Sequence, residues 1–554
     1  MCGIYAVIAP KGVTCSWAPK ALELLRHRGP DASGHTVVQL SWCSVTLGQT
    51  RLSIVDQGPV RVPWSDPREG LTVAYNGEIY NWRELRAELG GPWETQCDVE
   101  VLARAWRQWG YGCLDHLNGM FAFVLVDSLR NEVHAVRDRA GEKPLYWATR
   151  GESTYLASEA KALPVAHTER PCLDSATLEF DFAEDTPFAG VQSVLPGHRF
   201  SWSPARRDTS WWSLPIAAED HDPDAEKELP DLLVDAIRLR AQSDSPIALQ
   251  LSGGLDSSII QAVVGSDRLY CVTFPDEGVD HLTAATAAAQ GHPIRPVTFT
   301  REDMLEALPQ IAYHLDTPAT WTAVCQWFMA KAMGEDGVRV VLSGEGADEL
   351  FFGYTRYRIL WHLQHMRDDR HLDAYAPLLH RVLGGPMGHL LAVMLDRARA
   401  DDTLDHAEHL IAEHGGPHKG SLVRRMARTD FYTTMQVLLR MADRMAMAHS
   451  IENRSPFFDY RLMELSTRLP IWKLVNAHQS KSILREIASD LGVPSSIVNE
   501  GTKRGLFIPK AWGAGEQWDR RWYTRLSHKH WENRCLCTAH CAPEQMGCLP
   551  RDSP

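Results

Sequence analysis

A cysteine stands at position 2, and it becomes the N-terminal residue when Met1 is removed. Its thiol would then lie beside a free α-amino group with a reference pKa of about 8, so that one residue supplies both a nucleophile and its base. Any second-position cysteine has this property, and the alternative is an ordinary structural cysteine. The residues that accompany Cys2 therefore decide between the two.

Three short motifs supply groups that suit such a thiol. Arg51 follows Gly-Gln-Thr, Asn76 and Gly77 form a pair, and Asp98 follows a cysteine. An arginine can bind an α-carboxylate in bidentate fashion, and an aspartate can pair with an α-ammonium. An asparagine amide and a glycine backbone N–H can form an oxyanion hole. Together these groups predict a pocket for a free amino acid whose side-chain amide faces the thiol.

A second group of residues has the composition of a phosphate-binding loop. Residues 252–258 read Ser-Gly-Gly-Leu-Asp-Ser-Ser, between an expected strand and an expected helix. Gly253 and Gly254 would let the backbone approach a phosphate, hydroxyl groups and helix N–H groups would donate to it, and Asp256 could hold Mg²⁺. The loop lacks the Gly-Lys-Ser/Thr of a P-loop and the G-x-G-x-x-G pattern. The alternative is a simple strand-to-helix turn.

A third group follows the run Val338–Leu342. Glu345 and Asp348 would lie at the carboxyl end of a parallel strand, where they could serve as a general base and a metal ligand. The alternative is an acidic helix start favoured by the helix dipole. Lys481 could stabilise phosphate charge, although the residues around it fit a solvated helix lysine as well.

Periodicity predicts two kinds of domain to position these groups. Alternating runs predict a mixed, strand-rich domain over residues 2–205. Its expected strands are Ile4–Ile8, Val37–Leu40, Ser44–Leu47, Leu71–Tyr75, Phe121–Val126, Glu132–Val136, Thr154–Ala157 and His198–Trp202, and its expected helices are Trp82–Leu89 and Asp98–Trp109. Residues 206–230, rich in Pro, Asp, Glu, Ser and Trp, predict a linker.

Beyond the linker, apolar strands alternate with helices over residues 231–520, which predicts a parallel sheet covered on both faces. The expected strand and helix pairs are Ile247–Leu251 with Ser257–Val264, Leu269–Phe274 with Leu282–Ala289, Ile294–Phe299 with Met304–Tyr313, and Val338–Leu342 with Asp348–Phe352. Residues from about 354 to 500 read as helical, with one long helix expected over Thr429–Met447. Residues 521–554 predict a loosely held tail.

Composition excludes several classes of protein. The 554 residues are 44% hydrophobic and 23% charged, typical of packed globular domains, and the formal charge of −13 without a basic run argues against nucleic acid as a partner. The chain shows neither a signal peptide nor an apolar run of about 18 residues, so a cytoplasmic protein without a membrane segment is expected. Cys535, Cys537, Cys541 and Cys548 lack paired zinc spacing, which favours an unstructured tail over a metal site.

Ordered motifs over residues 2–515 resemble one family closely, the glutamine-dependent asparagine synthetases of the asparagine synthetase B type. The matching blocks are Met1–Ile4, Leu25–Asp31, Arg51–Asp56, Asn76–Asn81, Gly119–Phe123, Arg137–Arg139, Ser252–Ser258, Leu342–Leu350, Asp443–Met445 and Glu452–Phe457. The resemblance implies an α/β protein with two domains. An N-terminal-nucleophile glutaminase of αββα layers is followed by an adenine nucleotide alpha-hydrolase-like (PP-loop) synthetase domain.

The resemblance also implies roles for individual residues. Cys2 would be the glutaminase nucleophile, with Arg51, Asn76, Gly77, Glu78 and Asp98 as glutamine and oxyanion contacts. The ATP contacts would be Leu251, Ser252, Gly253, Gly254, Asp256, Ser257, Phe274, Ser343 and Gly344, and Asp256 and Asp348 would hold Mg²⁺. Glu345 would help ammonia attack an acyl-adenylate, and Lys481 would lie over the phosphates. The partners would be glutamine, ATP and an acceptor carboxylate, by default aspartate.

The segment Asp316–Trp327 departs from the family where the acceptor should bind, because it has two tryptophans and no basic residue. A small dianion such as aspartate prefers a basic or hydroxyl-rich pocket. Trp321 and Trp327 would suit a larger carboxylate, unless they lie in the core. A tailoring amidotransferase is therefore the rival to an asparagine synthetase, while the intact set of catalytic residues argues against a non-catalytic relative. The oligomeric state stays open, a homodimer included.

Overall fold

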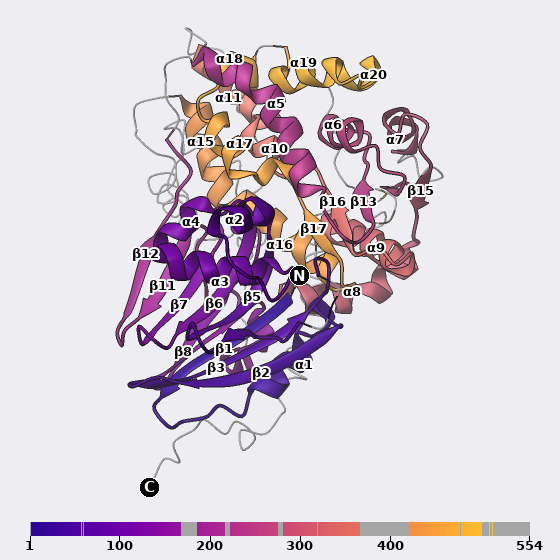
Figure 1. The fold of residues 1–554 in the computed structure, drawn as a ribbon. Coiled ribbons are helices and arrows are strands. Elements are labelled where there is room, and N and C mark those ends of the chain that lie inside the picture. Colours follow the sequence, from indigo (N-terminus) through magenta and orange to yellow (C-terminus); the bar gives the residue numbers. More distant parts are fainter. Residues whose placement is uncertain are drawn as a thin grey trace, which may run out of the picture.

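A computed structural model of the chain describes residues 2–56, 58, 60–167, 186–216, 222–274, 281–317, 320–365, 421–476, 478–500, 509 and 512. Two parts lie against each other, one built on two stacked sheets and the other on a smaller sheet surrounded by helices (Figure 1). The cysteine-rich segment 535–548, for which an unstructured tail was expected, lies outside the described residues. No helix within the described ranges is long and apolar enough to cross a membrane.

The N-terminal part consists of two antiparallel sheets of six strands each. The first has the order β10 (Val191–Ser193), β8 (Tyr146–Arg150), β9 (Ser153–Ala157), β1 (Cys2–Pro10), β3 (Cys43–Arg51) and β2 (Ala32–Gln39). The second has the order β12 (Arg206–Ser210), β11 (His198–Trp202), β7 (Glu132–Arg137), β6 (Gly119–Asp127), β5 (Leu71–Ile79) and β4 (Trp64–Asp66).

Alternation along the strands explains why these sheets stack. Every second residue of β1, Ile4, Ala6 and Ile8, packs into one cluster with Ala122 and Val124 of β6, between the sheets. The intervening residues of β1 pack against α1 (Ala18–Leu24). The other face of the second sheet carries α2 (Trp82–Leu89), α3 (Asp98–Trp109) and α4 (Cys113–His116) (Figure 1). These layers confirm the predicted αββα sandwich.

The second part contains a five-stranded sheet in which every pair is parallel, as predicted. Its order is β15 (Ile294–Val297), β14 (Leu269–Val272), β13 (Ile247–Gln250), β16 (Val340–Leu342) and β17 (Glu452–Arg454). One face packs with α6 (Leu255–Val264) and α7 (Leu282–Ala288), the other with α8 (Arg301–Leu315) and α9 (Trp321–Glu335). Because both faces are covered, the strands are apolar throughout.

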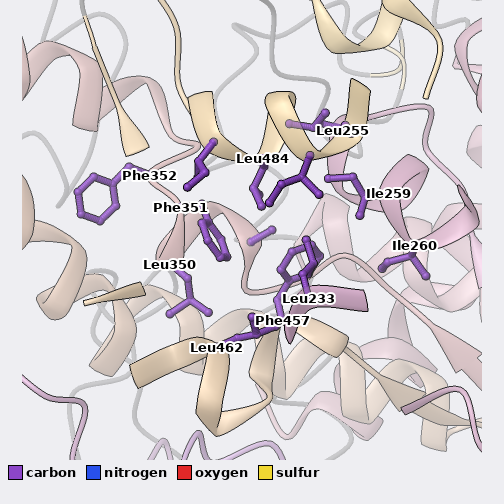
Figure 2. Packing of buried hydrophobic residues seen from close by; sticks show 14 of the residues in the cluster. Leu233, Leu255, Ile259, Ile260, Leu350, Phe351, Phe352, Phe457, Leu462 and Leu484 are labelled. Carbon is purple, nitrogen blue, oxygen red and sulfur yellow. The ribbon is translucent and has the colours of Figure 1, made fainter. Parts of the chain in front are cut away.

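Helices complete the second part. Within the described residues they are α5 (Pro223–Arg240), α10 (Ala347–Leu350), α11 (Thr355–His365), α15 (Leu422–Tyr432), α16 (Thr434–Met447), α17 (Tyr460–Ser466), α18 (Ile471–Leu474), α19 (Ser482–Asp490) and α20 (Ser495–Val498). Figure 2 shows how Leu233, Ile259, Phe351, Phe457 and Leu484, which come from segments far apart in the sequence, meet in one core. This core supports the loops that follow β13 and β16.

Three expectations about local structure are wrong. The expected linker 206–230 contains β12 and the start of α5, where Asp222 caps the helix by accepting from the backbone N–H groups of Asp224 and Ala225. The single helix over Thr429–Met447 is broken at Thr433, where α15 ends and α16 begins. The stretch expected to be helical includes β17, which pairs with β16. In β12 and β17, hydrogen bonding to a neighbouring strand decides the structure, although the local sequence pattern does not predict a strand.

Two candidate active sites

Cys2 starts β1 in the register opposite Arg51 of β3. Its side chain is buried, and its backbone N–H donates to Asn76 Oδ1 at 3.0 Å. The amide nitrogen of Gln49 donates to the Cys2 sulfur at 3.3 Å, while Gln49 Oε1 accepts from the Tyr75 N–H at 3.1 Å. The thiol is thus held against β5 by groups from two neighbouring strands.

Asn76 carries a donor that suits an oxyanion. Its Oδ1 is used by Cys2, while its Nδ2 is buried and has no hydrogen-bond partner within the described residues. A buried N–H without a partner is costly, which favours a ligand oxygen in this place. The neighbouring Gly77 has room for no side chain, since a Cβ there would lie 2.3 Å from the Met120 carbonyl oxygen. Both features fit the predicted oxyanion hole.

Two buried carboxyl groups line the same region. Asp98 accepts from the Tyr75 hydroxyl at 2.6 Å and from the Ile79 N–H at 3.0 Å. Burial raises the pKa of Asp98 above its usual value, although these hydrogen bonds oppose the effect. Burial, and then the nearby Asp98, raise the pKa of Glu78 as well, and Arg454 lies 3.5 Å from Glu78. A ligand with an ammonium group would stabilise the charged form of both.

Arg51 organises the loop beside this pocket. Its guanidinium donates to the carbonyl oxygens of Gly58 at 3.0 Å and Val55 at 3.2 Å, and it lies 3.6 Å from the Cys97 sulfur. The side chain is therefore committed to the backbone of Val55, Asp56 and Gly58 in this conformation. Its predicted contact with a carboxylate stays a prediction.

The loop after β13 has the shape expected of a phosphate cradle. Gly253 has a φ of +72°, and a Cβ there would lie 2.5 Å from the backbone of Ala284 and Ala285. The Gly254 N–H donates to the Ser252 hydroxyl at 3.2 Å, and the Ser257 hydroxyl lies 3.2 Å from that of Ser252. The turn therefore leads directly into the N-terminus of α6, where backbone N–H groups favour an anion.

Lys481 connects this loop to the one after β16. Its ammonium donates to Asp256 at 2.6 Å and lies 2.7 Å from Asp348 Oδ1. Burial would lower the pKa of Lys481, but the two carboxylates raise it above its usual value. No group of three His, Cys, Asp or Glu side chains able to hold a metal occurs in the described part of the chain. Two carboxylates plus phosphate oxygens nevertheless suit Mg²⁺, which binds few protein ligands.

Glu345 lies in the same loop and is held by amides that the sequence did not single out. Gln326 Nε2 donates to its Oε1 at 3.2 Å, and Asn453 Nδ2 donates to its Oε2 at 3.1 Å. The Ser343 hydroxyl donates to Oε2 as well. Burial raises the pKa of Glu345, and these hydrogen bonds oppose the effect. A carboxyl group with a raised pKa suits a general base near neutral pH.

The remaining predicted ATP contacts are placed unevenly. Gly344 lies beside Asp256, since a Cβ on it would be 3.0 Å from the Asp256 Cβ. The side chain of Leu251 is fully buried in the core, and that of Phe274 packs against Phe299 at 4.8 Å between ring centroids. In this conformation their side chains belong to the core.

From Trp321 on, the segment expected to bind the acceptor belongs to α9, which is capped by Thr320, whose side chain accepts from the Ala323 N–H. Asp316 lies at the C-terminal end of α8. Val324, Cys325 and Trp327 are buried in the core cluster on that side of the sheet, and Trp321 packs on its edge. The core interpretation therefore holds for Trp327, while Trp321 is only partly buried against the cluster. Gln326 is the residue of this helix whose described contacts reach Glu345.

Arg28 is the other important residue that the chemistry of the motifs missed. Its side chain is fully buried, and its Nε donates to the carbonyl oxygen of Cys2 at 3.2 Å. Its Nη1 donates to Glu159 at 2.9 Å and to Asp443 of α16 at 2.8 Å. The blocks Leu25–Asp31 and Asp443–Met445 were both part of the family resemblance, and they were the available signals for this contact.

An apolar cluster lies between the two parts of the chain. Leu52, Ile54 and Met120 of the first part pack with Val340 and Met447 of the second, and all five are at most 3% exposed. Leu52 directly follows Arg51 of the Cys2 pocket, and Val340 belongs to the strand that leads to Glu345. Each site therefore has a near neighbour along the chain in this apolar layer.

Comparisons with known proteins agree on the two parts. A family model described as glutamine amidotransferase domain matches residues 1–212, and one described as asparagine synthase matches residues 228–537. Asparagine synthetase [glutamine-hydrolyzing] 1 of Bacillus subtilis is 31% identical, over 88% of this chain and 83% of that protein. A putative asparagine synthetase of Mycobacterium tuberculosis (H37Rv) is 31% identical, over 92% of this chain and 88% of that protein. Amidase chry2 of Gibberella zeae is 26% identical, over 93% of this chain and 90% of that protein.

Proposed function

Because the chain belongs to the family of glutamine-hydrolysing asparagine synthetases, we propose that it moves the amide nitrogen of glutamine to a carboxylate activated as its acyl-adenylate. The observation that carries the proposal is Arg28, which contacts the backbone of Cys2 and the carboxylate of Asp443 together. One side chain thereby ties the nucleophile of the first part to the helix bundle of the second. Figure 1 places the N-terminus close to this boundary.

The first half-reaction releases ammonia at Cys2. The thiol proton passes to the α-amino group, and the sulfur attacks the side-chain amide carbon of glutamine. The amide oxygen becomes negatively charged in the tetrahedral state, where the unpaired Asn76 Nδ2 can donate to it. Ammonia then leaves with a returned proton, and water hydrolyses the thioester to glutamate. Asp98 and Glu78 would pair with the ammonium of glutamine.

The second half-reaction activates the acceptor. ATP binds with its phosphates at the Ser252–Ser258 loop, and Mg²⁺ held by Asp256 and Asp348 would neutralise phosphate charge. An acceptor carboxylate oxygen attacks the α-phosphorus, and pyrophosphate leaves with the electron pair of the broken P–O bond. Lys481 lies where it can balance the charge of the departing group. Ammonia reaches this adenylate along the apolar layer, and the products are the amide, AMP and pyrophosphate.

Aspartate is the default acceptor, which would make the enzyme an asparagine synthetase. A larger carboxylate is the second candidate, because Asp316–Trp327 contains no basic residue to meet a second carboxylate. A relative that aligns with 93% of this chain is named an amidase, which also supports a different acceptor. Free cysteines among the described residues suit a reducing compartment, and we place the enzyme in the cytoplasm.

The test is acceptor-dependent exchange of labelled pyrophosphate into ATP, measured across a panel of carboxylic acids. Saturable exchange with aspartate at millimolar concentration supports the asparagine synthetase and ends the second candidate. Exchange with an aryl or longer-chain acid but none with aspartate establishes the tailoring amidotransferase. Formation of ADP and phosphate in place of AMP and pyrophosphate would exclude the adenylate mechanism for both.

A further inference from the structure

The carboxylate of Glu345 is flanked by two side-chain amides from different elements, Gln326 of α9 and Asn453 of β17. An ionised carboxylate only accepts hydrogen bonds, so each amide must turn its NH₂ group toward it. The NH₂ group of each amide is therefore engaged by the carboxylate, and the carbonyl oxygen of each amide takes no part in these two hydrogen bonds.

Both carbonyl oxygens are left without a partner. Gln326 Oε1 and Asn453 Oδ1 are buried and accept no hydrogen bond within the described residues. The two residues are only 5% and 8% exposed. Buried polar atoms in folded proteins are almost always paired, so two unpaired acceptors beside one carboxylate indicate a missing donor.

The strand that carries Asn453 also reaches the other active site. Side chains alternate along a strand, and Arg454, on the opposite face from Asn453, lies 3.5 Å from Glu78 in the pocket of Cys2. Glu452, on the same face as Arg454, pairs with it. Consecutive residues of β17 therefore contact the source of ammonia and the proposed base.

We propose that Gln326 and Asn453 bind ammonia next to Glu345, with their carbonyl oxygens accepting its N–H groups. The proposal rests on the proposed function and adds the binding site of its nitrogen substrate. Ammonia is neutral and has three N–H groups. It can donate one hydrogen bond to each of the two amide oxygens and one to the carboxylate. It would wait there until the adenylate forms.

The site explains how the final step is balanced. The lone pair of ammonia forms a bond to the carbonyl carbon of the acyl-adenylate, and the bond from that carbon to the phosphate oxygen breaks with its electron pair on AMP. The nitrogen has one proton too many in the tetrahedral state. Glu345 accepts this proton, because its carboxylate lies beside the bound nitrogen.

The experiment compares Gln326→Met and Asn453→Leu with the parent chain, using ammonium chloride as the nitrogen source and the acid that supports pyrophosphate exchange. Both substitutions keep the approximate size and remove the acceptor oxygen together with the NH₂ group that donates to Glu345. Loss of support for Glu345 alone would lower kcat and leave the KM for ammonium unchanged. We expect the KM for ammonium to rise about tenfold in each variant, the factor expected for one lost hydrogen bond. The KM for the acceptor in pyrophosphate exchange, which needs no ammonia, should stay unchanged.

Gln436→Met is the matched control. Gln436 is a buried glutamine whose Oε1 also has no partner in the described part of the chain, but it lies on α16 and its amide nitrogen donates to the Ala140 carbonyl oxygen. The KM of the Gln436→Met variant for ammonium should equal that of the parent chain. In the glutamine-dependent reaction, the ratio of glutamate to amide product should rise in the two site variants, because unbound ammonia escapes. Gln326→Asn, which keeps a shorter amide, provides a second variant if Gln326→Met does not fold.

An unchanged KM for ammonium in both variants would overturn the proposal, since the oxygens would then be paired by water. A raised KM for the acceptor in pyrophosphate exchange would overturn it too, because the amides would bind the acceptor. Absence of exchange with every acid in the parent chain would instead refute the proposed function and remove the premise of the site.

Discussion

The guanidinium of Arg28 donates to both oxygens of the Asp443 carboxylate, at 2.8 and 3.1 Å, although 415 positions separate the two residues in the sequence. Glu159 accepts from Arg28 on one side and lies 2.8 Å from Arg444 on the other. All four side chains are almost fully buried. The boundary between the two parts is therefore held by paired charges as well as by the apolar layer.

Asp443→Asn should destabilise the protein strongly, because it leaves the buried Arg28 charge without its bidentate partner. Removing one member of a buried pair costs about 3–5 kcal/mol, whereas replacing both with apolar residues costs much less. The double variant Arg28→Met, Asp443→Leu should thus unfold later than Asp443→Asn in a urea titration. Asp224→Asn, in the exposed pair with Lys227, is the control and should show no measurable loss. The explanation would be contradicted if the double variant unfolded at a lower urea concentration than Asp443→Asn.

Cys2→Ala should abolish the release of glutamate from glutamine and leave amidation with added ammonium intact, since the two half-reactions use separate groups. Glutamate and amide product are measured separately. The control is Cys43→Ala, because burial raises the pKa of Cys43 to about 12 and keeps its thiol protonated and unreactive. Release of glutamate by Cys2→Ala at the parent rate would show that the nucleophile lies elsewhere.

Asn76→Ala should lower kcat for glutamine hydrolysis by about 10²–10³-fold with little change in the KM for glutamine, as expected for the loss of an oxyanion donor. The unpaired Nδ2 beside Cys2 motivates this prediction. Asn118→Ala is a matched control, since Asn118 is buried in the same part but donates to Asp459 at 2.9 Å. A rise in KM with an unchanged kcat would assign Asn76 to substrate binding alone.

Asp256→Asn should remove acceptor-dependent pyrophosphate exchange while glutaminase activity persists. Asp256 lies 2.6 Å from Lys481 at the phosphate loop, and it forms no part of the pocket around Cys2 described above. The same reactions are followed by measuring AMP, pyrophosphate and glutamate. Asp303→Asn, at the exposed start of α8, should change neither activity. Exchange that survives in Asp256→Asn at the parent rate would refute the role of this carboxylate.

His134→Gln should make the free energy of unfolding fall less steeply as the pH is lowered. Burial lowers the pKa of His134 to about 4, against a reference value near 6.5 in the unfolded chain. Between these values the unfolded chain binds a proton that the folded chain does not, so the parent loses up to about 3 kcal/mol as the pH falls from 6.5 toward 4. Thermal unfolding measured at several values between about pH 7 and about pH 4.5 should show a shallower slope of stability against pH for the variant. Parallel curves would mean that His134 does not contribute.

The sequence by itself determined the architecture and the types of chemical group. Alternating apolar residues in β1 and β6 required two covered sheets, because each side of a strand needs its own apolar partner. Gly253 and Gly77 were singled out in the sequence as a phosphate-loop glycine and as an oxyanion donor, and the structure adds that a side chain would fit at neither position. Local spacing also placed Asp256 at a helix start and Glu345 after a strand.

The tertiary structure decided which groups meet. Arg28 and Asp443, or Gln326 and Asn453 around Glu345, come from segments whose spacing along the chain carries no information about their distance. Trp327 illustrates the reverse case, because an aromatic residue on a helix fits a pocket or a core equally well until its neighbours are known. Pairing across the sheets and packing across the domain boundary are long-range contacts, and only the folded chain brings their partners together.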